Sequence, residues 1–303
     1  MITFEVETEL SACERLWKLF SPNEYLFDDW EYRVCFYDPA YYSLYFIVGK
    51  DNDALVGILP LWKARDKSYY EWFGGEFPER NRFMVRDNDL IQKILEQLPD
   101  DIWLPYMVRG EQKYLPIFTE ETRFFLDLEN YAFTLDGYLA TFSAKHRKNL
   151  KRDLKTLKSL NYSVVRNSIQ DFQRMIELNA RRFEKKSFFA EHDFIHGFQR
   201  LMEEALRRDE LEMISIHING VPEAVEVAIH HKETYAVLLG GNNLEISNIG
   251  KLLTVEHIKN ALEKKARIVD FLVDDCGWKR MWNMSEEPMY VYEHEPPSLP
   301  HTP

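Results

Sequence analysis

The feature that most constrains this chain is a long stretch that occurs twice in similar form. Residues 56–75, VGILPLWKARDKSYYEWFGG, match residues 223–241, EAVEVAIHHKETYAVLLGG, in length, in hairpin position and in a terminal Gly-Gly. Each copy is followed by a helical pattern and then by an apolar, strand-like run, residues 101–107 or 268–273. Repeats on the scale of a domain usually arise by duplication, so we expect two copies of one structural unit.

The repeat also predicts how the chain is divided. A chain of 303 residues is long enough for two domains of ordinary size. We expect an N-terminal unit over residues 1–130 and a C-terminal unit over residues 131–303, joined through residues 109–131.

Strand and helix patterns alternate in both units, with more strands than a strict alternation would have. Two strands around a turn that contains Asp-Asn are expected over residues 43–64. Single strands are expected over residues 2–10, 69–75, 101–107, 162–166, 211–220, 223–231, 234–241, 268–273 and 289–295. Helices are expected over residues 11–20, 89–98, 142–158, 168–183, 193–206 and 251–265. Ser11 and Glu14 have the spacing of a capping box for the first helix. This order predicts the α/β class (an α+β mixed sheet), with helices on both faces of the sheet.

Composition narrows the class of protein further. The net charge of −12 argues against a general binder of nucleic acid or of an anionic membrane. Cys13, Cys35 and Cys276 are far apart and form no CxxC pair, which argues against a zinc site and suits a reducing compartment. The first residues lack the pattern of a signal peptide, and no apolar run reaches the roughly 20 residues that span a bilayer. We therefore expect a cytoplasmic protein without metal and without membrane insertion.

The two copies differ after their Gly-Gly. The first continues with the bulky, charged residues 76–85, EFPERNRFMV, and the second with NNLEISNIGKLL, which leads straight into a helix. A helix start has unsatisfied N–H groups and a partial positive charge, so Gly250 and Lys251 suit the binding of a diphosphate. Alternatively, Ser247 or Asn248 only caps the helix and Gly250 packs closely.

Four stretches of the chain carry a resemblance to a known family. They are residues 142–165 (FSAKHRKNLKRDLKTLKSLNYSVV), 56–62 (VGILPLW), 247–253 (SNIGKLL) and 269–282 (VDFLVDDCGWKRMW). Together with the order of elements, they resemble the GNAT acyltransferase fold. More narrowly, the chain is similar to the CelD-like and Fem-type acyltransferases, which have two such units in tandem. It departs from their pattern at Val273-Asp274, where the family commonly has Arg-Gly, so an altered acceptor site is expected there.

The resemblance implies that acyl-CoA, with acetyl-CoA as the expected donor, binds the second unit. The bulky and acidic residues 76–85 predict that the first unit lacks CoA. The pyrophosphate would lie on the amides of Ile249, Gly250 and Lys251, beside Asn248. The pantetheine arm would pair with the end of residues 234–241, where two strands splay. Backbone N–H groups near Leu239, Gly240 and Gly241 would stabilise the oxyanion. The acceptor would be an amine on a small molecule or a peptide-like group.

Transfer to an amine requires a group that accepts its proton, because an amine has a pKa near ~10. Glu226 lies beside the strand that would hold the thioester and is our candidate base; alternatively, it is an edge charge that reaches solvent. Lys279 is the candidate for holding the acceptor or the oxyanion, and Trp278 for lining its site; alternatively, the aromatic packs on the sheet beside a solvated lysine. Asp274, with Asp275, is a candidate for binding the ammonium group or for replacing Glu226.

The basic helix over residues 142–158 carries two further candidates, Lys145 and Arg147, for binding a phosphorylated acceptor or the phosphates of CoA. The alternative is an ordinary solvated face opposite a leucine seam. Cys276 has no basic neighbour except Lys279, so direct attack of the amine on the thioester is expected. Two other functions stay open: a Fem-type transferase that uses aminoacyl-tRNA on a cell-wall precursor, and a GNAT-like binding protein without turnover.

Overall fold

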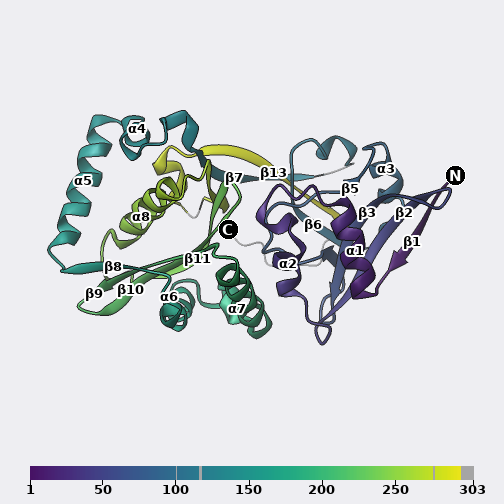
Figure 1. Ribbon diagram of the computed structural model, residues 1–303, viewed down its shortest axis with the longest axis horizontal. Coiled ribbons are helices and arrows are strands. Elements are labelled where there is room, and N and C mark those ends of the chain that lie inside the picture. The colour runs from purple at the N-terminus through teal and green to yellow at the C-terminus, as the bar shows by residue number, and fades with distance from the viewer. Residues whose placement is uncertain (100, 116–117, 276, 295–303) are drawn as a thin grey trace. The chain divides into compact units, whose positions relative to one another are not determined.

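The computed structural model describes residues 1–99, 101–115, 118–275 and 277–294, and its chain divides into two compact units (Figure 1). Unit 1 comprises Met1–Arg123 and Glu287–Pro303, and unit 2 comprises Phe124–Glu286. The chain passes into unit 2 within one strand and returns to unit 1 within another. The division at residues 130/131 that the repeat predicts lies further along the chain and assigns the C-terminal strand to the second unit.

Unit 1 is built on a mixed sheet in which β4 and β6 run parallel and the other ladders of its described residues are antiparallel. Its strands, in spatial order, are β1 (Ile2–Glu7), β2 (Tyr42–Asp51), β3 (Ala54–Ala64), β4 (Tyr70–Trp72), β6 (Ile102–Met107) and β13 (Ser285–His294), with β5 (Met84–Val85) paired to β3. The α-helices are α1 (Leu10–Phe20), α2 (Trp30–Arg33) and α3 (Leu90–Leu95), and short 3-10 turns lie at Leu26–Asp28, Val34–Phe36 and Gln112–Tyr114.

Unit 2 has a sheet of the same kind, in which β11 and β12 are parallel. Its strands, in spatial order, are β8 (Tyr162–Arg166), β9 (Leu211–Ile218), β10 (Val221–His231), β11 (Thr234–Asn242), β12 (Ile268–Val273) and β7 (Thr119–Asp127). The α-helices are α4 (Leu135–Ala140), α5 (Ala144–Lys158), α6 (Phe172–Phe183), α7 (His192–Arg207) and α8 (Ile249–Glu263), with 3-10 turns at Leu128–Tyr131, Ile169–Asp171, Glu184–Lys186, Phe188–Ala190 and Lys279–Trp282.

The order of strands β1, β2, β3, β4 and β6 in unit 1 is repeated as β8, β9, β10, β11 and β12 in unit 2. The pairings agree as well: three antiparallel ladders are followed by one parallel ladder in each case. The sixth position belongs to β13 in unit 1 and to β7 in unit 2. The architecture therefore has the duplication that the two matching stretches predict.

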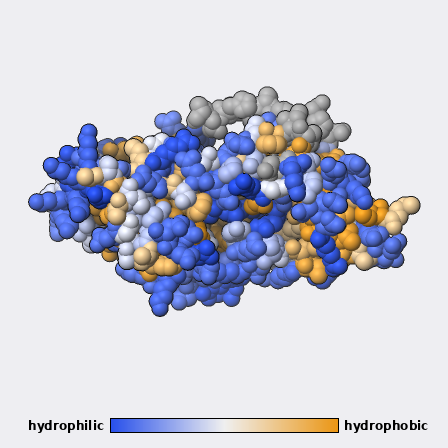
Figure 2. Space-filling view, turned by 90° about the horizontal axis from the view of Figure 1, so that it is seen from above, coloured by the Kyte–Doolittle hydropathy of each residue, from blue (hydrophilic) through white to orange (hydrophobic). Residues whose placement is uncertain are grey.

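The two faces of the unit 2 sheet carry different helices, as Figure 1 shows: α5 and α8 lie on one face, and α6 and α7 on the other. Strand β10 explains the close approach of α8, because Ala224 and Ala228 belong to the core clusters that contain residues of this helix. The face shown in Figure 2 is largely hydrophilic, with hydrophobic residues in separate groups. Within the described residues, every helix is too short or too polar to cross a membrane.

Candidate functional site

The parallel ladder of unit 2 is short. Strand β11 pairs with β12 only from Thr234 to Ala236, and no further β11–β12 pair follows within the described residues. On its other side, β11 stays paired with β10 as far as Asn242. The second half of β11 therefore keeps one strand neighbour and has diverged from the other.

The β10–β11 ladder contains a β-bulge at the point where β11 diverges from β12. Val227 of β10 pairs with Leu239, and Ala228 pairs with Val237, so Leu238 is an extra residue on β11. A bulge bends the strand that carries it and increases its twist. The bulge thus accounts for the change in direction of β11 just after its last pair with β12.

Helix α8 begins soon after β11 ends, and the Ile249 amide in its first turn already donates to the Ile246 carbonyl at 3.4 Å. Its N-cap residue, Asn248, has a left-handed backbone (φ 67°) and makes no side-chain capping bond. The Asn248 carbonyl instead accepts from the amides of Lys251 (3.0 Å) and Leu252 (3.3 Å). A Cβ atom built on Gly250 meets nothing within 4 Å, so this glycine is not closely packed. The start of the helix can be approached by a ligand at Gly250.

Lys251 is tied to the basic helix α5. Its ammonium lies 2.7 Å from the Asp153 carboxylate, and the hydrogen bond lowers the pKa of Asp153. The lysine side chain keeps 40% of its surface exposed. It therefore retains an accessible positive charge beside Gly250.

The other basic-helix candidates have different surroundings. Lys145 is exposed at the start of α5. Arg147 donates to the carbonyls of Ala140 (3.0 Å) and Phe142, so its guanidinium fastens the connection between α4 and α5. These hydrogen bonds give Arg147 a structural role.

Glu226 lies opposite Gly240 in the β10–β11 ladder. Its side chain is 24% exposed, and its Oε2 lies 3.2 Å from Nε2 of His257, which is fully buried on α8. Glu226 is therefore neither a solvated edge charge nor a fully buried one. Its carboxylate lies on the α8 face, with one side in contact with the core.

Leu239, Gly240 and Gly241 are confined between β10 and α6. A Cβ atom on Gly241 would be 2.5 Å from the Met175 carbonyl oxygen, so the helix lies directly on this strand. The side-chain amide of Asn179 donates to the Gly240 carbonyl at 2.6 Å. These contacts fix the backbone of β11 where it has diverged from β12.

Lys279 is placed differently from a solvated lysine. It is 5% exposed, and its ammonium donates to the carbonyls of Val273 (2.6 Å) and Leu272 (3.3 Å), which has a left-handed backbone. Trp278 is half-buried and packs edge-to-face on Phe271, with ring centroids 5.9 Å apart. Lys279 and Trp278 thus hold the end of β12 in place.

The two remaining candidates of this loop are not alike. Asp274 is exposed and has a left-handed backbone (φ 65°). Asp275 accepts from the Arg280 amide at 2.9 Å. Cys276, which the sequence singled out as a conceivable nucleophile, lies outside the described residues.

Unit 1 closes the corresponding place with its own backbone. The β4–β6 ladder ends at the pair Glu71 and Trp103, but Asn81 then forms a parallel bridge with Met107. The backbone N–H of Asn81 donates to the Tyr106 carbonyl (2.9 Å), and the backbone carbonyl of Asn81 accepts from the Val108 amide (3.0 Å). Residues 78–82, here named the unit 1 insert, thus occupy the edge of β6.

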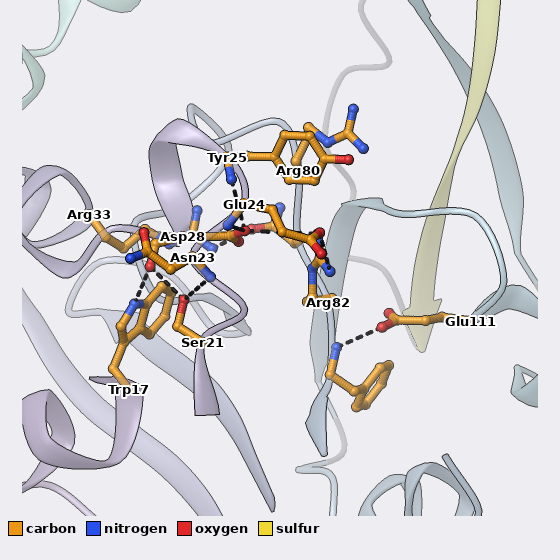
Figure 3. A network of polar contacts seen from close by, with 12 residues as sticks. Trp17, Ser21, Asn23, Glu24, Tyr25, Asp28, Arg33, Arg80, Arg82 and Glu111 are labelled. Carbon is orange, nitrogen blue, oxygen red and sulfur yellow. Dashed lines mark hydrogen bonds and ion pairs between the residues drawn. The ribbon is translucent and has the colours of Figure 1, made fainter. Parts of the chain in front are cut away.

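Side chains anchor the unit 1 insert (Figure 3). Arg80 stacks on the Tyr25 ring, with its guanidinium 3.6 Å from the centroid, and Arg82 pairs with Glu24 at 3.2 Å. The Asn81 side chain accepts from Arg33, whose burial lowers its pKa to about 9. The bulky, charged residues that follow the first Gly-Gly are therefore packed into the fold.

A family comparison agrees with the geometry of unit 2. Residues 144–280 match the family described as acetyltransferase (GNAT) domain, and this stretch lies within unit 2. Unit 2 therefore contains a GNAT domain, as the resemblance in the sequence indicated.

Solved structures extend this likeness to nearly the whole chain. A tandem GNAT protein from the clavulanic acid biosynthesis pathway is 11% identical, with a TM-score of 0.58, over 98% of this chain and 100% of that one. FemX is 10% identical (TM-score 0.59; 94% and 96%), and a conserved protein of unknown function from Bacteroides thetaiotaomicron VPI-5482 is 13% identical (TM-score 0.58; 97% and 100%). No curated protein matches the chain by sequence. At such identities the likeness shows the fold, and the tandem GNAT architecture with a mixed sheet is confirmed.

Three residues near Glu226 escaped the sequence analysis: His257, Tyr235 and Asn260. His257 and Asn260 are fully buried polar residues of α8, three positions apart. The signal in the sequence is this polar pair within a helix that also supplies Leu252, Val255 and Ile258 to the core.

Proposed function

We propose that unit 2 is an N-acyltransferase that moves an acyl group, with acetyl as the first candidate, from acyl-CoA to an amine. The GNAT family match supports a general acyltransferase. The observation that carries the finer proposal is the divergence of β11 from β12 after Ala236, followed within one short loop by the open start of α8 at Gly250. A strand edge that has no paired strand among the described residues and a helix N-terminus in series suit a ligand that has an amide-containing arm and a diphosphate.

In this proposal the donor binds along that series of groups. The pantetheine arm runs beside β11, and the diphosphate lies at the first turn of α8, where Gly250 leaves space and Lys251 supplies a positive charge. The backbone of Leu239–Gly241, held by β10 and α6, directs N–H groups at the thioester carbonyl. Because this backbone is fixed before the donor arrives, little reorganisation is needed during the reaction.

The reaction is a direct transfer. The amine nitrogen attacks the thioester carbonyl carbon, the C–S bond breaks, and CoA leaves as a thiol. Glu226 takes the proton that the attacking amine loses, directly or through water. Lys279 acts on the reaction through the loop after β12, because its two hydrogen bonds hold this loop in position. Trp278 and Asp274 in the same loop contact the acceptor.

Unit 1 does not bind the donor in this proposal. The unit 1 insert has taken the edge of β6, and α3 has only six residues, compared with 15 in α8. A bound pantetheine arm would have to displace Asn81 and its hydrogen bonds. We infer that this unit supports the fold and leaves donor binding to unit 2.

The test is binding of acetyl-CoA by calorimetry, with Gly250→Glu as the variant and Leu10→Glu as the control. Leu10 is the exposed first residue of α1, so the control also adds a carboxylate to a helix start. The parent and Leu10→Glu should bind acetyl-CoA, and Gly250→Glu should not, while its thermal unfolding without ligand stays cooperative. Equal binding by Gly250→Glu would refute the site. A parent that binds no acetyl-CoA but binds tRNA in a salt-sensitive manner would favour the aminoacyl-tRNA alternative.

A further inference from the structure

The face of unit 2 under α8 holds a chain of buried polar side chains that ends at Glu226. His257 is fully buried; its Nδ1 lies 2.9 Å from the Tyr235 hydroxyl, and its Nε2 lies 3.2 Å from Glu226 Oε2. Tyr235 is buried as completely. Polar groups in such a core cost free energy unless they hydrogen-bond, so their arrangement needs a reason.

The direction of each hydrogen bond follows from Arg166 at the far end. Arginine only donates, and Arg166 Nη1 lies 2.7 Å from Asn260 Oδ1, so the oxygen of this amide faces the arginine. The amide nitrogen then faces the other way and donates to Glu212 (2.7 Å) and to the Tyr235 hydroxyl (3.1 Å). Asn260 is thus fixed in one orientation.

This orientation sets the tautomer of His257. The Tyr235 hydroxyl accepts from Asn260, so its single hydrogen is left for His257 Nδ1. Burial raises the pKa of Tyr235, so the hydroxyl keeps this hydrogen at working pH. An imidazole that accepts at Nδ1 carries its hydrogen on Nε2, the atom that faces Glu226.

The contact between His257 and Glu226 is close but oblique. Nε2 makes no aligned hydrogen bond within the part of the chain that the structure describes, although the carboxylate oxygen is 3.2 Å away. The histidine cannot turn, since Tyr235 holds its other nitrogen. The Glu226 side chain is 24% exposed, so it is not enclosed by the core on every side. A small rotation of Glu226 towards Nε2 would satisfy the buried donor.

We propose that His257, fixed by Tyr235 and Asn260, is a positioning residue that orients the Glu226 carboxylate for acyl transfer. This inference rests on the proposed function of Glu226. The N–H group at Nε2 engages one carboxylate oxygen and leaves the other directed at the exposed side, where an amine can approach. A general base that is held in one orientation is effective, because a misplacement of about 1 Å can cost about 100-fold in rate.

The test compares two substitutions of His257. In His257→Gln the side-chain amide can place an N–H near the position of Nε2, whereas His257→Leu places none there. Turnover is measured as release of CoA thiol from acetyl-CoA in the presence of lysine, glucosamine and spermidine. His257→Leu should lower kcat about tenfold to 100-fold with KM for acetyl-CoA nearly unchanged, and His257→Gln should restore most of the loss.

The matched control is His231→Leu. His231 is also a buried histidine of unit 2, and its Nδ1 lies 2.9 Å from Glu210. Both leucine variants should lower the melting temperature, but only His257→Leu should lower kcat. Equal losses of kcat in both would show that destabilisation is the cause and would overturn the inference.

The outcome also separates this inference from the proposed function. If Glu226→Gln loses turnover while His257→Leu keeps it, the positioning role is wrong and the function of Glu226 stands. If the parent neither binds acetyl-CoA nor releases thiol, both proposals fall. If His257→Leu loses turnover and His257→Gln does not restore it, the hydrogen at Nε2 is not the property that matters, and the inference is overturned.

Discussion

Glu226 and Gly240 face each other across the β10–β11 ladder, and the glycine makes space for the acid. A Cβ atom on Gly240 would lie 2.8 Å from Glu226 Cγ and 2.9 Å from its Cβ. These atoms belong to the root of the side chain and cannot move away without a shift of the strand. The glycine at this position therefore decides where the Glu226 carboxylate lies.

Gly240→Ala should separate Glu226 from His257. The added methyl group must displace the Glu226 side chain, so kcat should fall about tenfold or more, while acetyl-CoA affinity changes little. The control is Gly49→Ala in β2, where the atoms nearest to a Cβ belong to the side chains of Phe4 (3.2 Å) and Val56 (3.4 Å). Thiol release and calorimetry check both variants. An unchanged kcat in Gly240→Ala would mean that the position of Glu226 does not limit the reaction.

Glu226→Gln tests the base itself. The amide keeps the shape of the side chain but accepts a proton poorly, so kcat should fall by about 10²–10⁴ with acetyl-CoA affinity nearly unchanged. The loss should shrink at high pH, where the acceptor amine loses its proton without help. Glu233→Gln, at the exposed β10–β11 turn, serves as the control. Full turnover by Glu226→Gln across the pH range would leave Asp274 as the next candidate.

The number of donor sites follows from the unit 1 insert. Calorimetry should give one acetyl-CoA per chain, because Asn81 already pairs with the edge of β6. Gly250→Glu should reduce this number to zero, since no second site is left. Two molecules per parent chain, or one per chain of the variant, would show that unit 1 binds the donor.

Lys279→Met should affect stability and turnover together. The substitution removes a charged donor from the carbonyls of Leu272 and Val273, which should lower the free energy of unfolding by about 1.5–3 kcal/mol. The loop after β12 should then move and slow turnover, with acetyl-CoA affinity retained. Urea denaturation and thiol release measure the two effects, with the exposed Lys185→Met as the control. A variant of parental stability would contradict the role that these hydrogen bonds indicate.

Patterns in the sequence predict the repeated elements well, because side-chain periodicity determines which residues a strand or helix can bury. The β10–β11 hairpin and its counterpart in unit 1 lie close to the expected ranges. Helix starts are harder to predict. Glu9, not Ser11, caps α1, since its carboxylate accepts from the amides of Ser11 and Ala12. Ser, Thr, Asp and Asn are the usual N-cap residues, so the sequence pattern does not indicate a glutamate as the cap.

The site was less accessible to prediction for two physical reasons. The bridge between Asn81 and Met107 is formed by backbone atoms, which every residue type has, so no residue pattern announces it. Lys279 and His257 are polar residues that the fold buries, and side-chain periodicity does not mark a polar residue as buried. Glu226 could be singled out because it interrupts an apolar strand beside two alanines, whereas the side chains that orient it are contributed by other elements.

A last prediction concerns Glu111, a half-buried acid of unit 1. Glu111 accepts from the Phe83 amide at 3.0 Å (Figure 3), and its second oxygen is buried without a hydrogen bond within the described residues. Burial raises the pKa of Glu111 from 4.5 to about 8, although the charge of Arg82 opposes this rise. The folded state therefore holds a proton that the unfolded state releases between these values. The contribution of the Glu111 proton to the free energy of unfolding is fully present below pH 4.5 and is lost as the pH rises towards about 8.

Glu111→Gln should remove this loss, because the amide stays neutral and keeps an oxygen for the Phe83 amide. Its gain in free energy of unfolding over the parent should be small near pH 5 and largest above pH 8. Urea denaturation followed by tryptophan fluorescence suits the measurement, since five of the seven tryptophans lie in unit 1. Glu120→Gln, at an exposed position of β7, controls for the loss of one negative charge. A gain that is the same at pH 5 and pH 9 would mean that the Glu111 carboxyl group does not hold its proton in the folded state.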